Sequence, residues 1–397
     1  MPETLNGKDF PHTPRFIHRL ERGILEIGFG YPMEFSLADL TNFRANVLSQ
    51  TPLGRLCGTK QRFRDRYEIL KILGRGGFGV TFLVRDVVLP GEPLCVIKQL
   101  CPKVSDAIAL QRARQRFQQE AKTLANLGSH AQIPLLLDYF EAEGEFYLVQ
   151  EFIRGNTLAK EVRRSGTFTE TAVKQFLREL LPLLQYIHDN NVIHRDIKPP
   201  NLIRCKDDGR LVLIDFGAVK EHIAQTEESS LRHSTTQFVG TVGFAPPEQL
   251  ASRPVYSSDL YAVGITCLYL LSGKSPLDFD YEFMTGEVRW RDYVDVSDHL
   301  ARVLSRMLKI SAHERYHSAT DVMKALQLEA DWDTLRTCMT DVSTGLHVKP
   351  EPEFILEGYI PPLMRQAEAI RERRAKFQAR QARSDRAHLK LYTSSGF

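Results

Sequence analysis

Apolar and polar residues alternate through residues 67–73, and this period of two predicts a β-strand. Two further apolar runs, residues 80–84 and 94–97, lie on either side of a turn at residues 89–93 that is rich in Gly and Pro. The pattern predicts three strands in sequence, with a glycine-rich loop between the first two.

A helical period replaces the strand pattern over residues 107–127. Phe117, Ala121 and Leu124 recur three or four residues apart and therefore share one side of the expected helix. Glu120 lies on the adjoining face. The helix is therefore expected to have one apolar face with a carboxylate beside it.

Two more strands are predicted near residues 135–140 and at 146–150, and the chain becomes mainly helical beyond Gly155. The strongest helical period there is carried by Phe176, Leu177, Leu180, Leu181, Leu184 and Ile187. A β-rich first part followed by an α-rich second part predicts an α+β protein with a small β lobe and a larger α lobe. The chain has no internal repeats.

The two ends of the chain lack this regularity. Residues 1–66 mix Pro, Gly and short apolar patches without a sustained period, and they are expected to be an N-terminal extension of unassigned role. Residues 331–397 are expected to be a C-terminal tail, with a proline-rich break before a basic helix. The folded domain is therefore expected to span residues 67–330.

The basic helix carries a local excess of positive charge. Residues 365–390 contain nine basic and three acidic side chains, a net charge of +6. Two interpretations remain open: a solvated surface helix, or a segment that docks onto an acidic partner or surface. The net charge of the whole chain is only +3, which is too small to indicate a nucleic-acid partner.

Composition places the chain among ordinary globular proteins. Of its 397 residues, 43% are hydrophobic and 25% charged, so a large core can form. The six cysteines are scattered, without the paired spacing of a zinc site, and are expected to be thiols in a reducing cytoplasm. The longest apolar run, residues 260–271, is shorter than the roughly 20 residues of a membrane span. It is expected to be a buried helix of a protein that is not integral to a membrane.

Three short motifs carry candidate chemistry. Residues 74–79 read Gly-Arg-Gly-Gly-Phe-Gly, residues 194–201 read His-Arg-Asp-Ile-Lys-Pro-Pro-Asn, and residues 215–217 read Asp-Phe-Gly. The glycine motif alone is weak evidence, because it also opens dinucleotide-binding folds and occurs in simple turns. Asp-Phe-Gly could also be a simple turn, but it follows Asp196 by nineteen residues, after an apolar run. The order and separation of the three motifs suit ATP-dependent phosphoryl transfer.

The set resembles the protein kinase signature, and the resemblance runs from about Tyr67 to about Leu328. Segments such as residues 77–82, 95–99 and 147–152 look most like the corresponding segments of bacterial serine/threonine kinases, especially those of the cyanobacterial branch. The resemblance implies a two-lobed protein-kinase-like fold, ATP and Mg²⁺ as cofactors, and phosphorylation of Ser or Thr hydroxyls on protein substrates. It also implies autophosphorylation and a role in bacterial signalling.

The resemblance gives the small-lobe residues roles toward ATP. Backbone N–H groups must approach the phosphates closely, so Gly74, Gly76 and Gly79 fit a loop that covers them. Lys98 ends an apolar strand, where a lone ammonium group is costly without an anionic partner. The family pairs this lysine with the α- and β-phosphates and with a helix glutamate, which matches Glu120.

In the large lobe, Asp196 matches the catalytic aspartate that accepts the proton of the acceptor hydroxyl. Lys198 matches the lysine that neutralises charge on the transferred phosphate, and its presence is typical of serine/threonine kinases. Asn201 and Asp215 offer hard oxygen ligands that suit Mg²⁺. These four residues form the expected catalytic and metal-binding set.

Adenine is expected to bind the linker between the lobes. The resemblance assigns it to backbone groups of Glu151 and Ile153, with Gln150 at the gate of the inner pocket. Thr81 and Val96 depart from the Val and Ala of the family motifs at the adenine roof. These departures concern nucleotide affinity and leave the phosphoryl-transfer residues unchanged.

The resemblance also implies contacts that hold the large lobe together. Glu248, in the Ala-Pro-Pro-Glu element, is expected to pair with Arg315. Asp259 is expected to steady the catalytic loop, and Thr241 to hydrogen-bond Asp196 and Lys198.

A regulatory switch is expected beside the catalytic loop. Arg195 precedes the catalytic aspartate, and in the family such an arginine accompanies an activation loop that is ordered by a phosphate. Thr235 and then Thr236 are the expected phosphate sites within residues 218–240. The alternative is that this Ser/Thr-rich run is only a flexible polar loop.

Two other functions compete with the kinase interpretation. A pseudokinase scaffold would keep the fold and recruit partners through its tails, but every phosphate, metal and base position is filled. A small-molecule kinase would usually lack Lys198 and the peptide-binding segment between Thr241 and Glu248.

Overall fold

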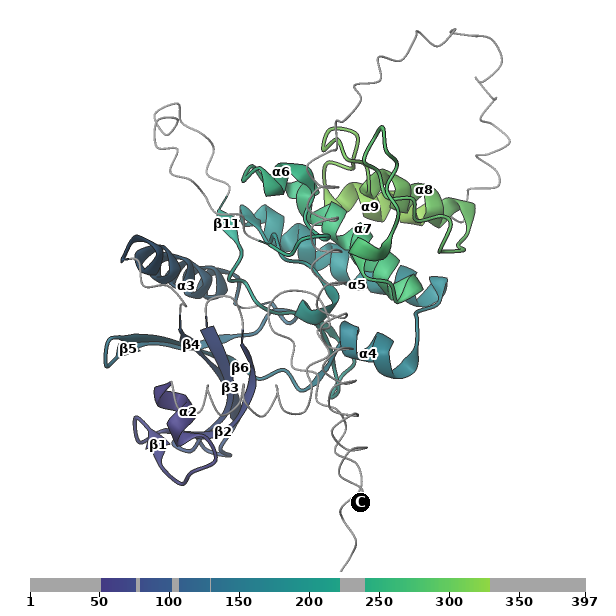
Figure 1. The fold of residues 1–397 in the computed structure, drawn as a ribbon. Coiled ribbons are helices and arrows are strands. Elements are labelled where there is room, and N and C mark those ends of the chain that lie inside the picture. Colours follow the sequence, from purple (N-terminus) through teal and green to yellow (C-terminus); the bar gives the residue numbers. More distant parts are fainter. Residues whose placement is uncertain (1–50, 76–78, 102–106, 129, 222–239, 329–397) are drawn as a thin grey trace, which may run out of the picture.

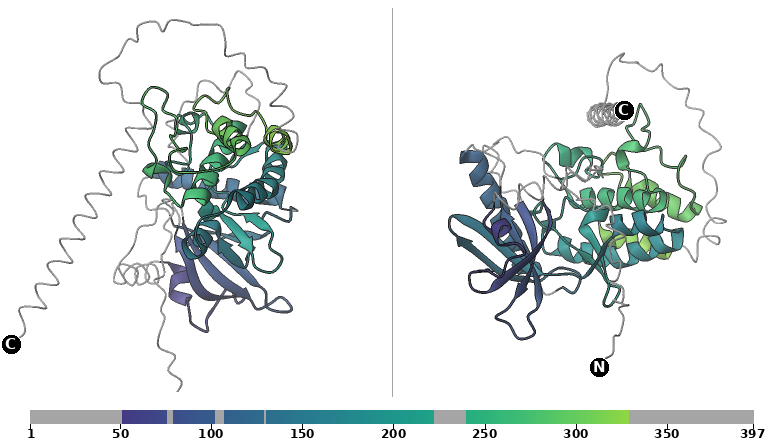
Figure 2. Two further views of the ribbon diagram at one scale, coloured as in Figure 1. Left: turned by 90° about the vertical axis from the view of Figure 1, so that its right-hand side faces the viewer. Right: turned by 60° about the horizontal axis from the view of Figure 1, so that its bottom comes forward.

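The fold is taken from a computed structural model, which describes residues 51–75, 79–101, 107–128, 130–221 and 240–328. A β-rich small lobe and a helical large lobe lie side by side, at the lower left and upper right of Figure 1. The second view of Figure 2 shows the same division from another side. The α+β, two-lobed fold predicted from the periodicities is confirmed.

The small lobe is built on one curled antiparallel sheet of six strands, in the order β1-β2-β3-β4-β6-β5. The strands are β1 (Arg62–Phe63), β2 (Tyr67–Arg75), β3 (Gly79–Asp86), β4 (Leu94–Leu100), β5 (Leu136–Ala142) and β6 (Glu145–Glu151). All neighbouring strands run antiparallel, so consecutive strands can be joined by short turns. One turn, between β2 and β3, holds the glycine motif.

Helix α3 (Ala107–Leu127) spans the residues predicted to be helical. Its apolar side, with Phe117, Ala121 and Leu124, is buried in the same cluster as Leu100 and Leu148 of the sheet. Because side chains alternate along a strand, this packing puts the side chain of Lys98 on the α3 face as well. Helix α3 and strand β4 thereby bring Glu120 and Lys98 to a common site.

The opposite face of the sheet is covered by a segment that precedes the expected domain start at residue 67. Helix α2 (Pro52–Leu56) and strand β1 lie there, and β1 pairs with the first residues of β2. Leu53 and Phe63 are buried in a second cluster with Ile69, Phe82 and Ile97. The folded small lobe therefore includes residues 51–66, because the curled sheet has an apolar outer face that this segment covers.

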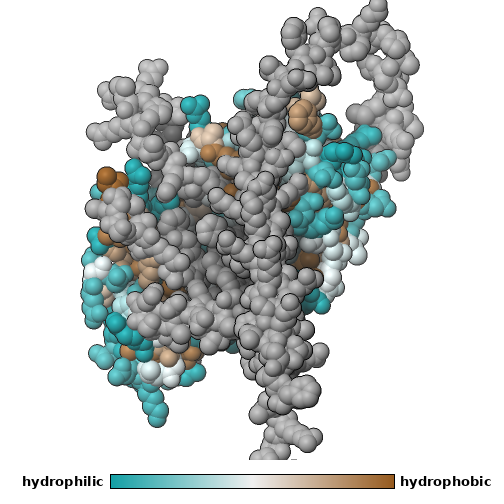
Figure 3. Space-filling model, in the orientation of Figure 1, coloured by the Kyte–Doolittle hydropathy of each residue, from teal (hydrophilic) through white to brown (hydrophobic). Residues whose placement is uncertain are grey.

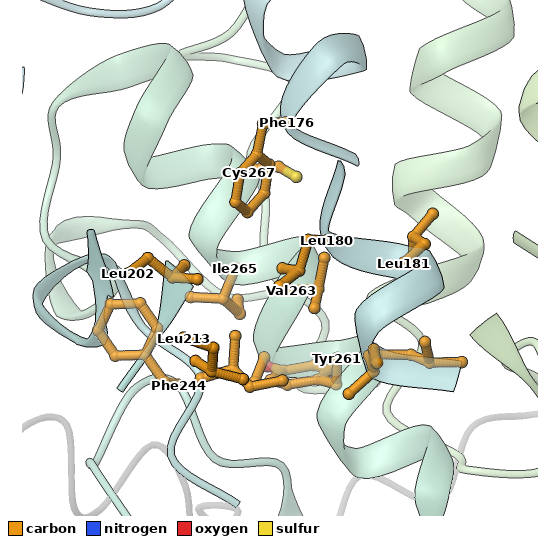
Figure 4. Packing of buried hydrophobic residues seen from close by; sticks show 14 of the residues in the cluster. Phe176, Leu180, Leu181, Leu202, Leu213, Phe244, Tyr261, Val263, Ile265 and Cys267 are labelled. Atoms are coloured by element: carbon orange, nitrogen blue, oxygen red, sulfur yellow. The ribbon is translucent and has the colours of Figure 1, made fainter. Parts of the chain in front are cut away.

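The large lobe surrounds two long buried helices, α5 (Glu170–Asp189) and α7 (Tyr256–Ser272). The other helical elements are α4 (Leu158–Ser165), α6 (Pro247–Leu250), α8 (Asp298–Met307), α9 (Ala319–Gln327), and the short η1 (Pro199–Asn201) and η3 (Pro276–Asp278). Two small antiparallel sheets complete this part of the molecule. One consists of β7 (Gly155–Thr157), β9 (Leu202–Cys205) and β10 (Leu211–Leu213). The other consists of β8 (Val192–Ile193) and β11 (Lys220–Glu221). Figure 4 shows side chains of α5, α7, β9 and β10 in one core, among them Phe176, Ile265, Leu202 and Leu213.

The apolar run at residues 260–271 lies within α7, which is buried along nearly its whole length. The prediction of a buried core helix is confirmed. None of the helices in the described ranges is long and apolar enough to cross a membrane. In the view of Figure 3, hydrophilic residues predominate on the described surface of the large lobe.

Candidate active site

Lys98 forms ion pairs at the junction of the lobes. Its Nζ lies 2.8 Å from both carboxylate oxygens of Glu120 and 3.0 Å from Oδ1 of Asp215. Strand β4, helix α3 and the Asp-Phe-Gly turn of the large lobe each contribute one of the three groups. The structure thus brings together the lysine and glutamate that the family resemblance pairs, and adds the aspartate to them.

Burial and charge act in opposite directions on these groups. Burial favours the neutral amine, but the carboxylates of Asp215 and Glu120 outweigh it and raise the pKa of Lys98. Burial also raises the pKa of Glu120, against the opposing charge of Lys98. For Asp215, burial is outweighed by Lys98 and then Lys198, which lower its pKa to about 2. Lys98 and Asp215 are therefore charged at neutral pH.

The catalytic loop surrounds the carboxylate of Asp196 with donors. Oδ1 accepts a hydrogen bond from the Thr241 hydroxyl at 2.7 Å. Oδ2 accepts from Asn201 Nδ2 at 3.0 Å and pairs with Lys198 Nζ at 2.9 Å. Lys198 also donates to Thr241 at 2.7 Å. Asp196, Lys198, Asn201 and Thr241 thus form one network, with the contacts that the resemblance implied for Thr241.

The carboxylate of Asp259, in α7, holds the backbone of this loop in place. This buried carboxylate accepts the N–H groups of His194 at 2.9 Å and Arg195 at 2.8 Å, and it pairs with His188 Nε2 at 2.9 Å. Arg195 and Asp215 adopt positive φ angles of 66° and 67°, which are uncommon for residues with a side chain. The anchored carboxylate helps to hold the loop in this conformation, as expected for Asp259.

Two glycines leave room at the site. A Cβ atom on Gly217 would lie 3.1 Å from Glu120 Oε2 and 3.3 Å from Lys98 Nζ, so a side chain there would crowd the ion pairs. A Cβ on Gly79 would lie 2.2 Å from the backbone oxygen of Gln99. Gly79 is therefore required by the close pairing of β3 and β4, a reason that its motif did not reveal. Gly74 pairs with Thr81 in the sheet, whereas Gly76 lies outside the described residues.

The linker between the lobes carries the residues expected to bind adenine. The N–H of Glu151 donates to the backbone oxygen of Leu135 at 2.9 Å, so this donor is already used within the small lobe. The side chain of Ile153 is buried with Cys205 and Val212 of the large lobe. Contact between these residues and adenine stays a prediction.

Arg195 contacts the start of the activation loop. Its Nε donates to the backbone oxygen of Ala218, and Nη2 donates to that of Val219 at 2.8 Å. Burial, only partly offset by Asp259, lowers the pKa of Arg195 to about 10. Thr235 and Thr236 lie outside the described residues, so the phosphate sites stay predictions.

Two further contacts organise the molecule around the site. Arg315 Nη1 lies 2.6 Å from Glu248 Oε1, the ion pair that the resemblance implied. Gln132, which the sequence reasoning missed, donates from Nε2 to the backbone oxygens of Glu179 at 3.1 Å and Leu211 at 2.9 Å. It links the segment after α3 to the large lobe. No periodicity or motif marks this glutamine, so the sequence held no signal for it.

Comparison with known proteins agrees with this geometry. The protein kinase domain family matches residues 67–327. Serine/threonine-protein kinase B of Synechocystis sp. is 53% identical over 275 residues, covering 68% of this chain and 48% of that protein. Serine/threonine-protein kinase PknA of Nostoc sp. is 44% identical over 271 residues, again covering 68% and 48%. The chain thus spans about half the length of these curated relatives. Since the family match extends over most of the chain and includes every residue of the Lys98 and Asp196 networks, the chain belongs to the protein kinase domain family.

Proposed function

We propose that this chain transfers the γ-phosphoryl group of ATP to Ser or Thr hydroxyls of protein substrates. The observation that carries the proposal is the network around Asp196, in which Lys198 and Thr241 contact one carboxylate. A phosphoryl-transfer site needs a positioned base with a cation beside it, and the family match supports this interpretation. Relatives named as serine/threonine kinases support the acceptor class.

The carboxylate of Asp196 has the capacity to act on the acceptor. A carboxylate offers about four lone-pair sites, and hydrogen bonds from Thr241, Asn201 and Lys198 use three of them. The remaining site can accept the hydrogen bond of a Ser or Thr hydroxyl and then its proton. Lys198 lies beside this position and would stabilise the negative charge on the transferred group.

The residues expected to bind metal fit a hard cation. Asn201 donates from Nδ2 to the backbone oxygen of Asp196 at 2.9 Å, so its amide oxygen points away from that contact and can serve as a ligand. Asp215 is ionised at neutral pH, as its low pKa requires. Mg²⁺, when bound, would neutralise charge on the phosphates of ATP. Lys98 would bind the α- and β-phosphates, held in place by Glu120.

The test is labelled phosphate transfer from ATP to a generic protein acceptor. We expect Asp196→Asn to lower turnover by about 10²- to 10⁴-fold, the usual contribution of a general base, with ATP binding nearly intact. Asp215→Asn and Lys98→Met should instead impair the use of Mg-ATP and leave the fold in place. Wild-type turnover in the Asp196 variant would show that the base is misassigned. No transfer by the wild-type chain, despite nucleotide binding, would favour the pseudokinase scaffold.

Regulation and partners are further parts of the proposal. Phosphate on Thr235 or Thr236 would place nearly two negative charges opposite Arg195 and order the activation loop. Phosphopeptide mapping of the active protein would locate it. Residues 365–390, which lie outside the described residues, are proposed to dock onto an acidic partner, and such docking would weaken with salt.

A further inference from the structure

The segment that precedes the family match at residue 67 is folded as part of the small lobe. We call residues 51–63 the cap. Its helix α2 begins with Thr51, whose hydroxyl accepts the N–H of Gly54 at 2.9 Å, and Pro52 follows at the first helical position. Both features favour a helix start. The local sequence therefore stabilises this short helix at a defined place in the chain.

The cap is buried against the face of the sheet that is opposite to α3. Leu53 is fully buried and Phe63 is 8% exposed, and both belong to the cluster that includes Ile69, Phe82 and Ile97. The ring centroids of Phe63 and Tyr147 lie 4.8 Å apart. Strands β2, β3, β4 and β6 thus all contribute to the surface that the cap covers.

Strand β2 depends on the cap at its open edge. Strand β1 pairs only with Tyr67 and Glu68, so the edge of β2 beyond them has no strand neighbour among the described residues. There the cap contacts β2 in place of a strand, because Gly58 donates its N–H to the backbone oxygen of Ile69 at 2.9 Å. Cys57 of the cap and Ile72 of β2 both pack against the same apolar cluster.

The same stretch of β2 is irregular on its other side. Its register with β3 shifts between Ile69 and Lys71, and again between Ile72 and Gly74. Such irregularities interrupt the ladder of hydrogen bonds and bend the strand. The hydrogen bond from the cap is made at Ile69, and Ile72 packs on the cluster that holds Leu53 and Phe63, so both residues lie beside these shifts. The cap therefore supports β2 where β3 supports it least, within a few residues of the glycine motif.

We propose that the cap positions the β2–β3 hairpin, and through it the glycine motif, for ATP binding. The functional nucleotide site would then depend on a segment that lies before the family match, which begins at residue 67. The inference rests on the proposed role of the glycine motif in binding the phosphates of ATP. The cap touches no nucleotide itself, so its residues are positioning residues.

The experiment uses the full chain with Leu53→Ala. We expect the KM for ATP, and the Kd of ADP measured by calorimetry, to rise about fivefold or more, a loss of roughly 1 kcal/mol in binding. The value of kcat and the KM for the protein acceptor should stay close to wild type. Amide hydrogen exchange should accelerate in residues 67–82. The matched control is Leu300→Ala in α8, which removes an equally buried leucine from the large lobe.

A milder pair of variants covers the case in which Leu53→Ala does not fold. Thr51→Ala removes the N-cap hydroxyl, whereas Thr51→Ser keeps it and should restore wild-type ADP affinity and exchange. Unchanged ADP affinity in folded Leu53→Ala and Thr51→Ala, or an equal loss in Leu300→Ala, would overturn the inference. Gly76→Ala separates the two hypotheses: if it also leaves ADP affinity unchanged, the role of the glycine motif fails. If it alone weakens binding, only the cap inference fails.

Discussion

His194 is a buried titratable side chain at the start of the loop that carries Asp196. Its Nδ1 accepts the N–H of Asp196 at 3.3 Å, and its ring meets Phe216 edge-on at 4.9 Å. Protonation of Nδ1 would remove this acceptor. Burial, only partly offset by Asp259, lowers the pKa of His194. The side chain is therefore a neutral packing group that also holds the backbone N–H of Asp196.

This environment predicts a pH dependence of stability. The pKa of His194 in the folded protein lies below its unfolded value of about 6.5, so the unfolded state binds more protons in between. The contribution of the neutral His194 side chain to the free energy of unfolding is fully present above pH ~6.5. It is lost as the pH falls, by at most about 1.4 kcal/mol per pH unit. In urea unfolding between pH 7.5 and 5.5, His194→Phe should flatten this dependence. The exposed His317→Gln is the control, and equal slopes in all three proteins would contradict the prediction.

At the scale of elements, Arg315 connects three parts of the large lobe. Its guanidinium donates to Glu248 in α6, to the backbone oxygen of Ser257 in α7 and to those of Lys309 and Ile310 after α8. The side chain is fully buried, so the carboxylate of Glu248 balances a charge that water does not reach. The position of α6 relative to α7 and α8 depends on this pair.

Removing the carboxylate should be costly. Glu248→Ala is expected to lower the free energy of unfolding by about 3–5 kcal/mol, because it leaves a buried guanidinium without its counter-charge. Urea denaturation followed by circular dichroism measures the change. Glu287→Ala breaks the partly exposed pair with Lys309 and should cost at most about 1 kcal/mol. If both variants lost the same stability, the buried pair would not have the structural role assigned to it.

At the scale of the whole molecule, Gln132 is a point where the small lobe is anchored to the large lobe. Its side chain bonds to α5 and β10, and its backbone oxygen accepts the N–H of Leu213 at 3.0 Å. Glu151 and Arg210 form a second link at 3.7 Å, but both side chains are partly exposed. Such a surface pair contributes little. Gln132 is therefore the stronger of these two links between the lobes.

Replacing this amide should loosen the lobes relative to each other. Gln132→Leu removes the two hydrogen bonds that the amide donates to the backbone oxygens of Glu179 and Leu211, which should lower the free energy of unfolding by about 1–3 kcal/mol. Because ATP is proposed to bind between the lobes, kcat/KM for ATP should fall as well. Gln118→Leu, on the exposed side of α3, controls for the change of residue type. Wild-type stability and kinetics in Gln132→Leu would argue against an anchoring role.

The types and order of the main elements could be predicted from the sequence, because the periods of strands and helices are local properties. Helix 107–127 and the buried run at residues 260–271 were found in this way. The motifs and their spacing also marked Lys98 and Asp196 as candidate catalytic residues. It could not show that the stretch before residue 67 covers the sheet, because short, irregular segments carry no period.

Contacts between residues that are distant in the sequence became visible only in the folded structure. Lys98 and Asp215 are 117 positions apart, and Gln132 and Leu211 are 79 apart, so no local pattern relates them. The tight packing of β3 on β4 gives Gly79 a structural reason that its motif did not contain. Burial of Leu53 likewise follows from the curled sheet and not from its own neighbours in the sequence. Local periodicity specifies elements, whereas contacts between them depend on how the assembled faces exclude water.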